Sequence, residues 1–419
     1  MAEIFLSSIH VQKVRHLRGF AIDLSKDKRH HLILTGKNGS GKTSLLKEMA
    51  RFLQSIPDKN YTHLSQCRND VEQRRIQRAQ VEKSSNLSSD QKKKQLWDID
   101  NQITQYSNYF DQYGGGVKLE FGNDTFLQDD FREGKYIIAM FEAKRTTEMQ
   151  APQGIKKVEL PLRYNINPQI SRQFIQYIVN LKADRSFAKD DKDIETANRV
   201  DEWFDNFILR LREIFEQPEL ELVFDRKNYN FTIKYPGRDD FDLTTLSDGY
   251  SAILAIVTEL LLRMESHRAK SYDVQGIVLI DEIETHLHIE LQKMILPFLV
   301  AFFPRIQFIV STHSPFILSS SADAIVYDLE KNLRVDDLTG YSYDGLVESY
   351  FDSDKYSLQI KDKLNRYETL AKQQSLSTAE QDEFASLRRH LKSIPSTVSP
   401  ELAVKFGQIE IERRSNRDG

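Results

Sequence analysis

The chain has 419 residues, of which 29% are charged and 40% hydrophobic, and 58 basic against 62 acidic side chains leave a formal net charge of −4. This length suits one large domain with insertions or two to three smaller domains. The nearly balanced charge neither indicates nor excludes a nucleic-acid binder, because a protein with little net charge can still carry a local stripe of basic residues.

Composition argues against membrane, secreted and disulfide-rich classes. The longest apolar run, Ile295–Pro304, has about half of the roughly 18 to 20 residues that a bilayer-spanning helix needs. No basic segment followed by a long apolar run opens the chain, so we expect no secretion signal. Cys67 is the only cysteine, which excludes an intramolecular disulfide and a cysteine-built zinc site. We expect a cytoplasmic protein without membrane contacts.

The first residues predict strands that lead into a glycine-rich loop. Apolar runs at Ile4–Leu6, Ile9–Val11 and Phe20–Ile22 predict three short strands, and His31–Thr35 predicts a fourth. Ser44–Leu53 then has apolar residues at helical spacing. Strand, glycine loop and helix in this order are the context that a phosphate loop requires.

The loop from Gly36 to Thr43 fits the pattern GxxxxGKT. Its glycines let backbone N–H groups curve around phosphates, Lys42 would reach the β and γ phosphates, and the Thr43 hydroxyl would ligate Mg²⁺. The predicted nucleotide contacts are Gly36, Asn38, Gly39, Ser40, Gly41, Lys42, Thr43 and Ser44.

Residues 58–113 predict an inserted helical hairpin, because Gln, Lys, Arg and Ser dominate while glycine and proline almost vanish. A serine-rich turn at 84–89 separates two arms, each of about 20 residues and roughly 30 Å long. Two ordinary surface helices are the alternative, since Arg74 and Arg78 interrupt the first arm's apolar seam. The heptad-spaced seam residues are Leu64, Cys67, Val71, Leu96, Ile99, Ile103, Tyr106 and Phe110.

The region after the hairpin mixes strands with helices. The predicted strands are Val117–Phe121, Tyr136–Phe141, Leu220–Phe224 and Asn230–Tyr235, and the predicted helices are Ser171–Leu181, Ala197–Phe215 and Tyr250–Met264, with the charged stretch Lys182–Glu195 between the first two. Gly276–Ile280 and Ile306–Val310 are continuous apolar runs typical of strands buried in a parallel sheet. The chain beyond residue 330 is mostly charged and helical, with a break at Ser393–Pro395.

Polar residues follow both buried strands. Asp281 would hold the Mg²⁺ shell, and Glu282 would orient or deprotonate an attacking water; a solvated acidic turn is the alternative. His313 could bond a γ phosphate, because a neutral imidazole both donates and accepts. A merely structural histidine is the alternative there.

The segment Leu246–Ser251 precedes a predicted helix, so its serine, free amides and positive helix end form a second anion site. One nucleotide rarely needs two such sites from one subunit. We therefore expect Ser247 and Gly249 to bind the γ phosphate held by another copy of the chain.

Together these motifs resemble the ABC-type ATPase heads of the SMC, RecF and OLD group. The resemblance places Walker A at Lys42, Walker B at Asp281 and Glu282, an LSGGQ-type signature at Leu246–Ser251, the D-loop at Glu284–His288 and the switch histidine at His313. It implies hydrolysis of ATP to ADP and phosphate with Mg²⁺, in a head-to-head dimer or higher oligomer.

The implied fold is an α/β head with a RecA-like core, an antiparallel β lobe, the inserted hairpin and a helical C-terminal extension. The expected domains are 1–57, the first part of the head with Walker A; 58–113, the hairpin; 114–330, the second part with signature, Walker B and switch histidine; and 331–419, a mostly helical region for assembly or effector binding.

Some residues depart from the family pattern. Asp248 stands where a glycine is frequent, Tyr250 and Ser251 stand where a glutamine or glutamate is frequent, and no glutamine fits a Q-loop. Arg145 matches an arginine that the group places near the nucleotide, after the strand Tyr136–Phe141. An exposed arginine is the alternative for Arg145.

The segment Thr339–Glu348 and the tail at Ser399–Leu402 resemble the compact anti-phage defence ATPases, PtuA-like in Septu and retron systems or AriA-like in PARIS. This implies an ATP-dependent switch, sensor or scaffold that controls an effector nuclease of HNH or TOPRIM type encoded nearby, with DNA or a phage protein as trigger. Glu348 and Asp352–Asp354 resemble TOPRIM carboxylates only superficially, so we expect no nuclease activity in this chain.

A RecF-like or SMC-like DNA-binding ATPase of repair or recombination is the alternative function. Its phosphate contacts would come from Arg68, Arg74, Arg75, Arg78 and Lys92–Lys94 on the hairpin. These side chains could equally form a solvated coiled-coil face. A third hypothesis is a non-enzymatic scaffold, in which bound nucleotide only stabilises an oligomer.

Overall fold

The computed structural model describes residues 3–84, 87–145, 149–167, 170–265, 274–341, 343, 345–346, 358–373, 377–392 and 400–415. The chain divides into two compact units, Met1–Tyr341 and Ser342–Gly419. The TOPRIM-like residues Glu348 and Asp352–Asp354 and the predicted break at Ser393–Pro395 lie outside the described residues.

A six-stranded sheet in the order β12-β11-β3-β10-β9-β5 forms the centre of the first unit. Neighbouring strands are parallel except for the edge strand β12, which runs antiparallel to β11. The five parallel strands are buried along their whole length, as expected for a sheet covered on both faces. The strands are β3 (His31–Thr35), β5 (Tyr136–Phe141), β9 (Gln275–Ile280), β10 (Ile306–Ser311), β11 (Ala324–Asp328) and β12 (Leu333–Asp336). The predicted α/β class is confirmed, and this sheet continues past residue 330.

An antiparallel sheet of β1 (Leu6–Val14), β2 (Leu17–Asp23) and β4 (Val117–Phe121), in the order β2-β1-β4, forms the β lobe. The prediction of separate strands at Ile4–Leu6 and Ile9–Val11 was wrong, because a single strand, β1, begins at Leu6 and continues through Ile9–Val11. Ser7 and Ser8 look like a break in the sequence, but they are buried and hydrogen-bonded within the sheet, to the Glu120 carbonyl and the Asp23 carboxylate.

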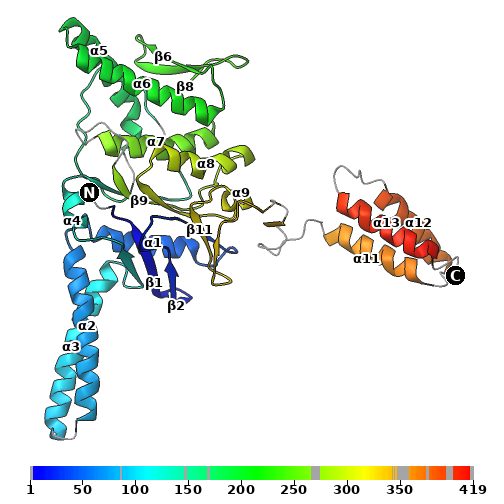
Figure 1. The fold of residues 1–419 in the computed structure, drawn as a ribbon, viewed down its shortest axis with the longest axis horizontal. Coiled ribbons are helices and arrows are strands. Elements are labelled where there is room, and N and C mark those ends of the chain that lie inside the picture. Colours follow the sequence, from blue (N-terminus) through cyan, green and yellow to red (C-terminus); the bar gives the residue numbers. More distant parts are fainter. Residues whose placement is uncertain are drawn as a thin grey trace. The chain divides into compact units, whose positions relative to one another are not determined.

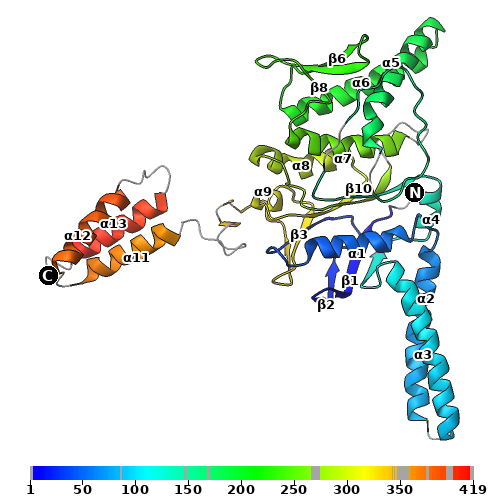
Figure 2. The same ribbon diagram turned by 180° about the vertical axis from the view of Figure 1, so that it is seen from behind.

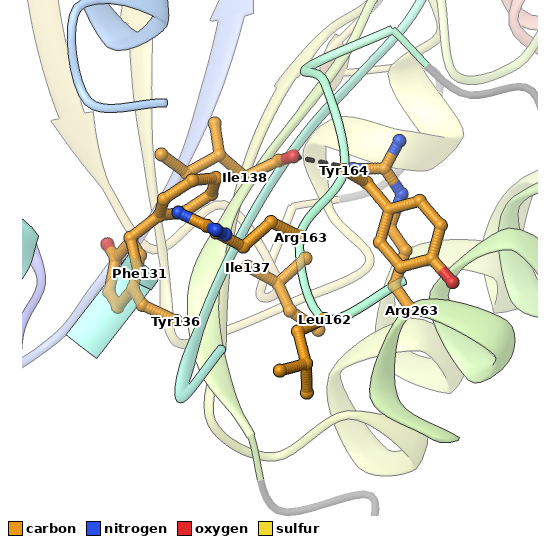
Figure 3. A pocket seen from close by; sticks show the side chains of 8 residues that line it. All are labelled: Phe131, Tyr136, Ile137, Ile138, Leu162, Arg163, Tyr164 and Arg263. Atoms are coloured by element: carbon orange, nitrogen blue, oxygen red, sulfur yellow. Dashed lines mark hydrogen bonds between the residues drawn. The ribbon is translucent and has the colours of Figure 1, made fainter. Parts of the chain in front are cut away.

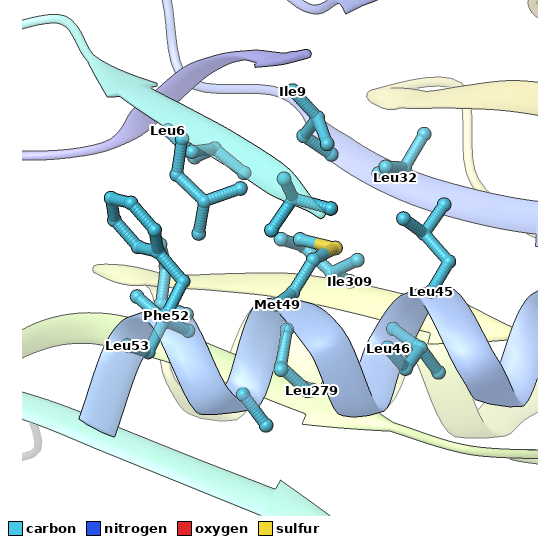
Figure 4. Packing of buried hydrophobic residues seen from close by; sticks show 14 of the residues in the cluster. Leu6, Ile9, Leu32, Leu45, Leu46, Met49, Phe52, Leu53, Leu279 and Ile309 are labelled. Carbon is cyan, nitrogen blue, oxygen red and sulfur yellow. The ribbon is translucent and has the colours of Figure 1, made fainter. Parts of the chain in front are cut away.

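Helix α1 (Lys42–Gln54) lies between these two sheets and starts at the phosphate loop. Figure 4 shows Leu45, Met49 and Phe52 of α1 among side chains of both sheets, such as Ile9 and Ile309. Burying one such side chain contributes about 1.5 to 3 kcal/mol, so α1 is firmly fixed. Helices α7 (Asp248–Glu265) and α8 (Ile289–Phe302) cover the opposite face of the central sheet (Figures 1 and 2).

Helices α2 (Tyr61–Lys83) and α3 (Ser89–Gln112) form an antiparallel pair that projects from the head (Figure 1). Arg78, which interrupts the apolar seam in sequence, reaches across to the other arm, where its Nε lies 2.7 Å from Asp100 Oδ1. Hydrogen bonds hold the base of the pair to α1 and join the start of α2 to the end of α3. The Gly116 N–H donates to Glu48 Oε1 at 2.9 Å, and Asn60 bonds the Tyr113 hydroxyl.

The first unit also contains further helices and a second antiparallel sheet in the order β6-β7-β8. Helix α5 continues to Asp190, although the charged stretch Lys182–Glu195 was expected to separate two helices. Lysine, arginine and alanine are good helix formers, and Ala183 and Ala188 are buried, so charge alone does not end the helix. These elements are α4 (Leu127–Arg132), the short 3-10 helix η1 (Ser171–Gln173), α5 (Phe174–Asp190), α6 (Ile194–Phe215), β6 (Glu221–Asp225), β7 (Asn230–Lys234), β8 (Phe241–Asp242) and α9 (Pro315–Leu318).

The second unit contains α11 (Leu358–Lys372), α12 (Thr378–Lys392) and α13 (Pro400–Ser415), as the predicted helical extension requires. Its core centres on Tyr367, whose ring stacks on Phe384 at a centroid distance of 4.6 Å. In the described parts of both units, no helix is both long enough and apolar enough to cross a bilayer.

Candidate functional site

The central sheet brings three predicted motifs to one edge. β3, β10 and β9 are parallel neighbours, so the loops that follow them meet at their carboxyl ends. These loops carry the phosphate loop, His313, and the pair Asp281 and Glu282, respectively. Segments more than 200 residues apart in sequence therefore meet at one place.

A cavity of about 220 Å³ opens at this edge. Apart from Arg15 and His16, every residue that lines it was predicted from the sequence. The lining consists of Arg15, His16, Asn38, Gly39, Gly41, Lys42, Thr43, Ser44, Glu282 and His313.

The phosphate loop is shaped by glycines in the left-handed region, among them Gly36 (φ 130°) and Gly41 (φ 101°). A Cβ at Gly41 would lie 2.9 Å from Leu17 Cδ1, so the Leu17 side chain on β2 would have to shift to make room for it. Lys42 Nζ donates to the carbonyls of Gly36 at 2.8 Å and Lys37 at 3.2 Å. The ammonium is thus held by the loop that would surround a phosphate.

Thr43 and Asp281, the two predicted metal ligands, lie in contact. Thr43 Oγ1 donates to Asp281 Oδ1 at 3.1 Å, and the Ser311 hydroxyl donates to the same oxygen at 2.6 Å. Ser311 Oγ also accepts the backbone N–H of Glu282 at 2.8 Å. Ser311 was not among the predicted site residues, although a polar residue that ends the apolar run Phe308–Val310 is a signal that could have identified it.

Glu282 has left-handed backbone geometry, with φ 45°, which costs a residue other than glycine about 1 to 3 kcal/mol. Hydrogen bonds fix this conformation from both sides. Its N–H bonds Ser311, and its carbonyl accepts from Arg145 Nη2 at 3.0 Å. The strained conformation directs the Glu282 side chain into the lining of the cavity.

Arg145 lies behind this loop and is 6% exposed, so the alternative of an exposed arginine is wrong. Its guanidinium donates to the carbonyls of Asp281 at 2.6 Å and Ile283 at 3.1 Å as well as to that of Glu282. Burial lowers the pKa of Arg145 to about 10, so it remains charged at neutral pH. Arg145 does not line the cavity where the nucleotide contact was predicted; it holds the loop that carries the acids.

Glu284 and His313 connect two of the loops. The His313 N–H donates to Glu284 Oε1 at 2.6 Å, and burial raises the pKa of Glu284. Burial, with Lys42 as the next cause, lowers the pKa of His313. The lowered pKa favours the neutral imidazole at pH 7, which offers a phosphate one N–H donor.

The signature-like segment lies at the start of α7, where the Ser251 N–H bonds the Ser247 carbonyl at 2.9 Å. Ser247 is exposed, and neither Ser247 nor Gly249 lines the cavity of its own chain. A Cβ at Gly249 would lie 3.0 Å from the carbonyl oxygen of His286 in the D-loop. Tyr250, a departure from the family pattern, stacks on Phe215 with ring centroids 4.2 Å apart and so packs α7 against α6.

Arg15 and His16 reach the cavity from the turn between β1 and β2, and His16 Nε2 lies 3.1 Å from the Ser40 carbonyl oxygen. No motif marks these two residues in the sequence. Only the pairing of β1 with β2 brings them beside the phosphate loop.

Comparisons with known proteins agree with the motifs. The chain is similar to the Septu protein PtuA of Bacillus mycoides (strain KBAB4), with 25% identity over 402 residues, which is 92% of this chain and 50% of that protein. It is 36% identical over 103 residues to the protein named "Retron Ec83 probable ATPase" from Escherichia coli, which is 24% of this chain and 17% of that one. The chain thus spans half or less of the length of these curated relatives.

Solved structures similar to the chain include the SMC head bound to the C-winged helix domain of ScpA, with 14% identity, a TM-score of 0.37 and coverage of 79% of this chain and 96% of that one. The SMC head domain from Thermotoga maritima has 14% identity, a TM-score of 0.33 and coverage of 77% and 94%.

A family model described as "AAA domain, putative AbiEii toxin, Type IV TA system" matches residues 32–319. The match includes the phosphate loop, both acids and the switch histidine. Since it spans well over half of the chain, the protein belongs to this AAA-domain family and is an SMC/ABC-like ATPase related to Septu PtuA and the retron ATPases.

Proposed function

We propose that this chain hydrolyses ATP with Mg²⁺ and that the reaction switches an anti-phage defence complex. The observation that carries the proposal is the convergence of Lys42, Glu282 and His313 on one cavity. The Lys42 cation would bind the terminal phosphate, and the Glu282 carboxylate would activate the attacking water. The neutral imidazole of His313 would sense the phosphate.

The residues at the cavity fit Mg²⁺. Mg²⁺ prefers hard oxygen ligands and is usually held by one or two carboxylates together with water and substrate phosphates. Thr43 Oγ1 and Asp281 Oδ1 are two such oxygens in contact, whereas no group of three or more His, Cys, Asp or Glu side chains in the described ranges is placed to hold a metal alone. When bound, Mg²⁺ would neutralise charge on the β and γ phosphates.

The chain's own residues supply the remaining steps. The Lys42 ammonium pairs with the phosphates, and the loop N–H groups surround them. The Glu282 carboxylate, which lines the cavity, orients the attacking water and accepts its proton. Ser311 and Arg145 keep Glu282 in its left-handed conformation, so they position the base without touching the nucleotide.

We further propose that two copies close head to head, or within a higher oligomer, so that Ser247 and Gly249 of one copy face the nucleotide of the other. The exposure of Ser247 at the positive end of α7 supports this contact, as does its absence from its own chain's cavity. Release of phosphate would remove the shared anion, and the heads would then separate.

The likeness to a Septu protein and to retron ATPases supports the defence role. In this proposal the chain is the switch, sensor or scaffold that restrains a partner nuclease of HNH or TOPRIM type encoded nearby, and DNA or a phage protein is the trigger. The alternative of a DNA-binding ATPase of repair or recombination is less well supported, because several of its proposed phosphate contacts are engaged within the protein. Arg68 donates to the Val117 carbonyl, Arg78 to Asp100 and Lys92 to the Glu82 carbonyl.

The substitution Glu282→Gln tests the ATPase assignment. We expect ATP affinity to be retained while phosphate release falls by about 10² to 10⁴-fold, the usual contribution of general acid–base catalysis. Glu290→Gln on the exposed start of α8 is the matched control and should turn over like the wild type. Wild-type turnover in Glu282→Gln would refute the assignment.

A further inference from the structure

A second cavity, of about 290 Å³, lies at the joint between α1 and α2, beside α4. The apolar residues among those that line it are Ile56, Pro57 and Phe131. The cavity shares no lining residue with the cavity at the phosphate loop. It is therefore a separate site, and no motif in the sequence marks it.

Three cationic side chains line this cavity: Lys59, Arg132 and Arg163. All three are exposed. Figure 3 shows the Arg163 side chain in a smaller cavity that shares Arg163 and Phe131 with this one and lies at the start of β5. Three residues that are distant in sequence thus contribute positive charge to one depression.

One carboxylate opposes these cations. Arg132 Nη2 lies 2.9 Å from Asp129 Oδ1, while neither Lys59 nor Arg163 forms an ion pair within the ranges that the structure describes. The lining therefore carries three positive charges against one negative charge. A ligand with two negative charges would balance it, and guanidinium groups bind phosphate through paired hydrogen bonds.

The shape of the cavity favours a small molecule over a nucleic-acid strand. Its volume is just below the usual range for small-ligand pockets, about 300 to 1,000 Å³, and suits a small molecule. Its three cations gather at one cavity, whereas a polynucleotide needs a positively charged groove that follows successive phosphates along its backbone.

We propose that this cavity binds a small phosphorylated molecule, with a terminal phosphate monoester between Lys59, Arg132 and Arg163. Since Pro57 and Lys59 connect α1 to α2, the bound ligand would contact both the helix that starts at the phosphate loop and the hairpin arm. The proposal stands on the cavity and its charges, and it does not depend on ATP hydrolysis.

Calorimetric titration of the full chain with ribose 5-phosphate and with a nucleoside 5′-monophosphate tests the proposal. We expect one site per chain, and at least about tenfold weaker binding in Arg132→Ala and in Arg163→Ala, because a hydrogen bond to a charged group contributes about a factor of ten or more. Asp129→Asn removes the opposing carboxylate and should tighten binding. Arg226→Ala, an exposed arginine in the turn between β6 and β7, is the matched control and should bind like the wild type.

Lys42→Ala distinguishes the two cavities. Binding that survives Lys42→Ala and is lost in Arg132→Ala supports the proposal, whereas the reverse pattern assigns the signal to the phosphate loop and overturns it. Equal affinity for the unphosphorylated nucleoside, or binding only of a single-stranded oligonucleotide that has no terminal phosphate, would also overturn it. The substituted side chains other than Lys42 are exposed, so thermal melting of those variants should show unchanged folding.

Discussion

The backbone N–H of His313 donates a 2.6 Å hydrogen bond to Glu284 Oε1, which joins the loop after β10 to the loop after β9. Ser311 and Asp281 form a second link between the same two strand ends, at 2.6 Å. With both links in place, Glu282 and His313 cannot shift independently. The structure therefore holds the proposed base and the proposed phosphate sensor as one unit.

Glu284 should act by positioning His313. In Glu284→Ala the His313 N–H loses its acceptor, so we expect kcat to fall by roughly tenfold or more with little change in the affinity for ATP. Glu284→Gln keeps an acceptor oxygen and should retain most of the activity. Steady-state ATPase kinetics on both variants check this, and equal loss in the two would show that the charge of Glu284, rather than its hydrogen bond, matters.

The substitution Arg145→Met tests whether Arg145 positions the loop after β9 or contacts the nucleotide. The variant leaves the carbonyls of Asp281, Glu282 and Ile283 without their buried donor, so the free energy of unfolding should fall by about 2 to 4 kcal/mol. ATP affinity should change by less than about tenfold, while turnover falls further. A large loss of affinity at unchanged stability would instead restore the nucleotide contact predicted from the sequence.

Arg15 and His16 are expected to contribute to nucleotide binding. Because Arg15 lines the cavity beside Lys42, Arg15→Ala should weaken ATP binding by about tenfold, the loss expected for one charge-assisted hydrogen bond. Arg18 lies in the adjoining strand β2, is exposed and does not line the cavity. Arg18→Ala is therefore the matched control in equilibrium binding, and equal effects of the two variants would contradict the assignment.

The sequence predicts this site well where a whole motif is contiguous. The phosphate loop needs its glycines and Lys42 within eight residues, and Asp281 and Glu282 directly follow an apolar strand. Arg15 escaped prediction because its role arises from strand pairing, which brings distant segments together without leaving a local pattern. Ser311 ends the apolar strand β10, but only the pairing of β10 with β9 places its hydroxyl beside Asp281. Arg145 was predicted to lie close to the nucleotide, but the sequence could not show that its guanidinium is buried behind the loop.

In the fold, as in the site, features with a local sequence pattern were predicted, and features that depend on distant contacts were not. Four of the five buried parallel strands were predicted closely, because each is a continuous apolar run of strand length. The fifth, β11, and the edge strand β12 were missed. Strand β1 was divided wrongly at Ser7 and Ser8, whose hydroxyls find partners only in the assembled sheet. Local sequence indicates which residues avoid water, whereas it does not show which polar residues are satisfied by distant partners.

His31 should make the stability of the first unit depend on pH. Burial, followed by the nearby Arg29, lowers the pKa of His31 to about 4, and its Nδ1 accepts the Phe308 N–H at 3.0 Å. Between pH 6.5 and pH 4, His31 is protonated in the unfolded chain but remains neutral in the folded chain. The free energy of unfolding therefore falls as pH falls through this window. The expected loss between pH 7 and pH 5 is about 2 kcal/mol.

Urea unfolding at pH 7 and pH 5 measures this effect. In His31→Gln, where the amide oxygen can still accept the Phe308 N–H, the His31 contribution to the pH dependence should disappear. His63→Gln, which changes an exposed histidine on α2, should keep it. An unchanged pH dependence in His31→Gln would show that another group is responsible.

The central claim is that two copies of this chain close on a shared ATP, and the mass of the assembly tests it most directly. Sedimentation of Glu282→Gln should show a mass increase to a dimer or higher oligomer when Mg·ATP is added. The same experiment on Glu282→Gln with Ser247→Arg should show no increase, because the exposed signature serine would be blocked. A mass that is independent of ATP, or an ATP-dependent assembly that tolerates Ser247→Arg, would contradict the account.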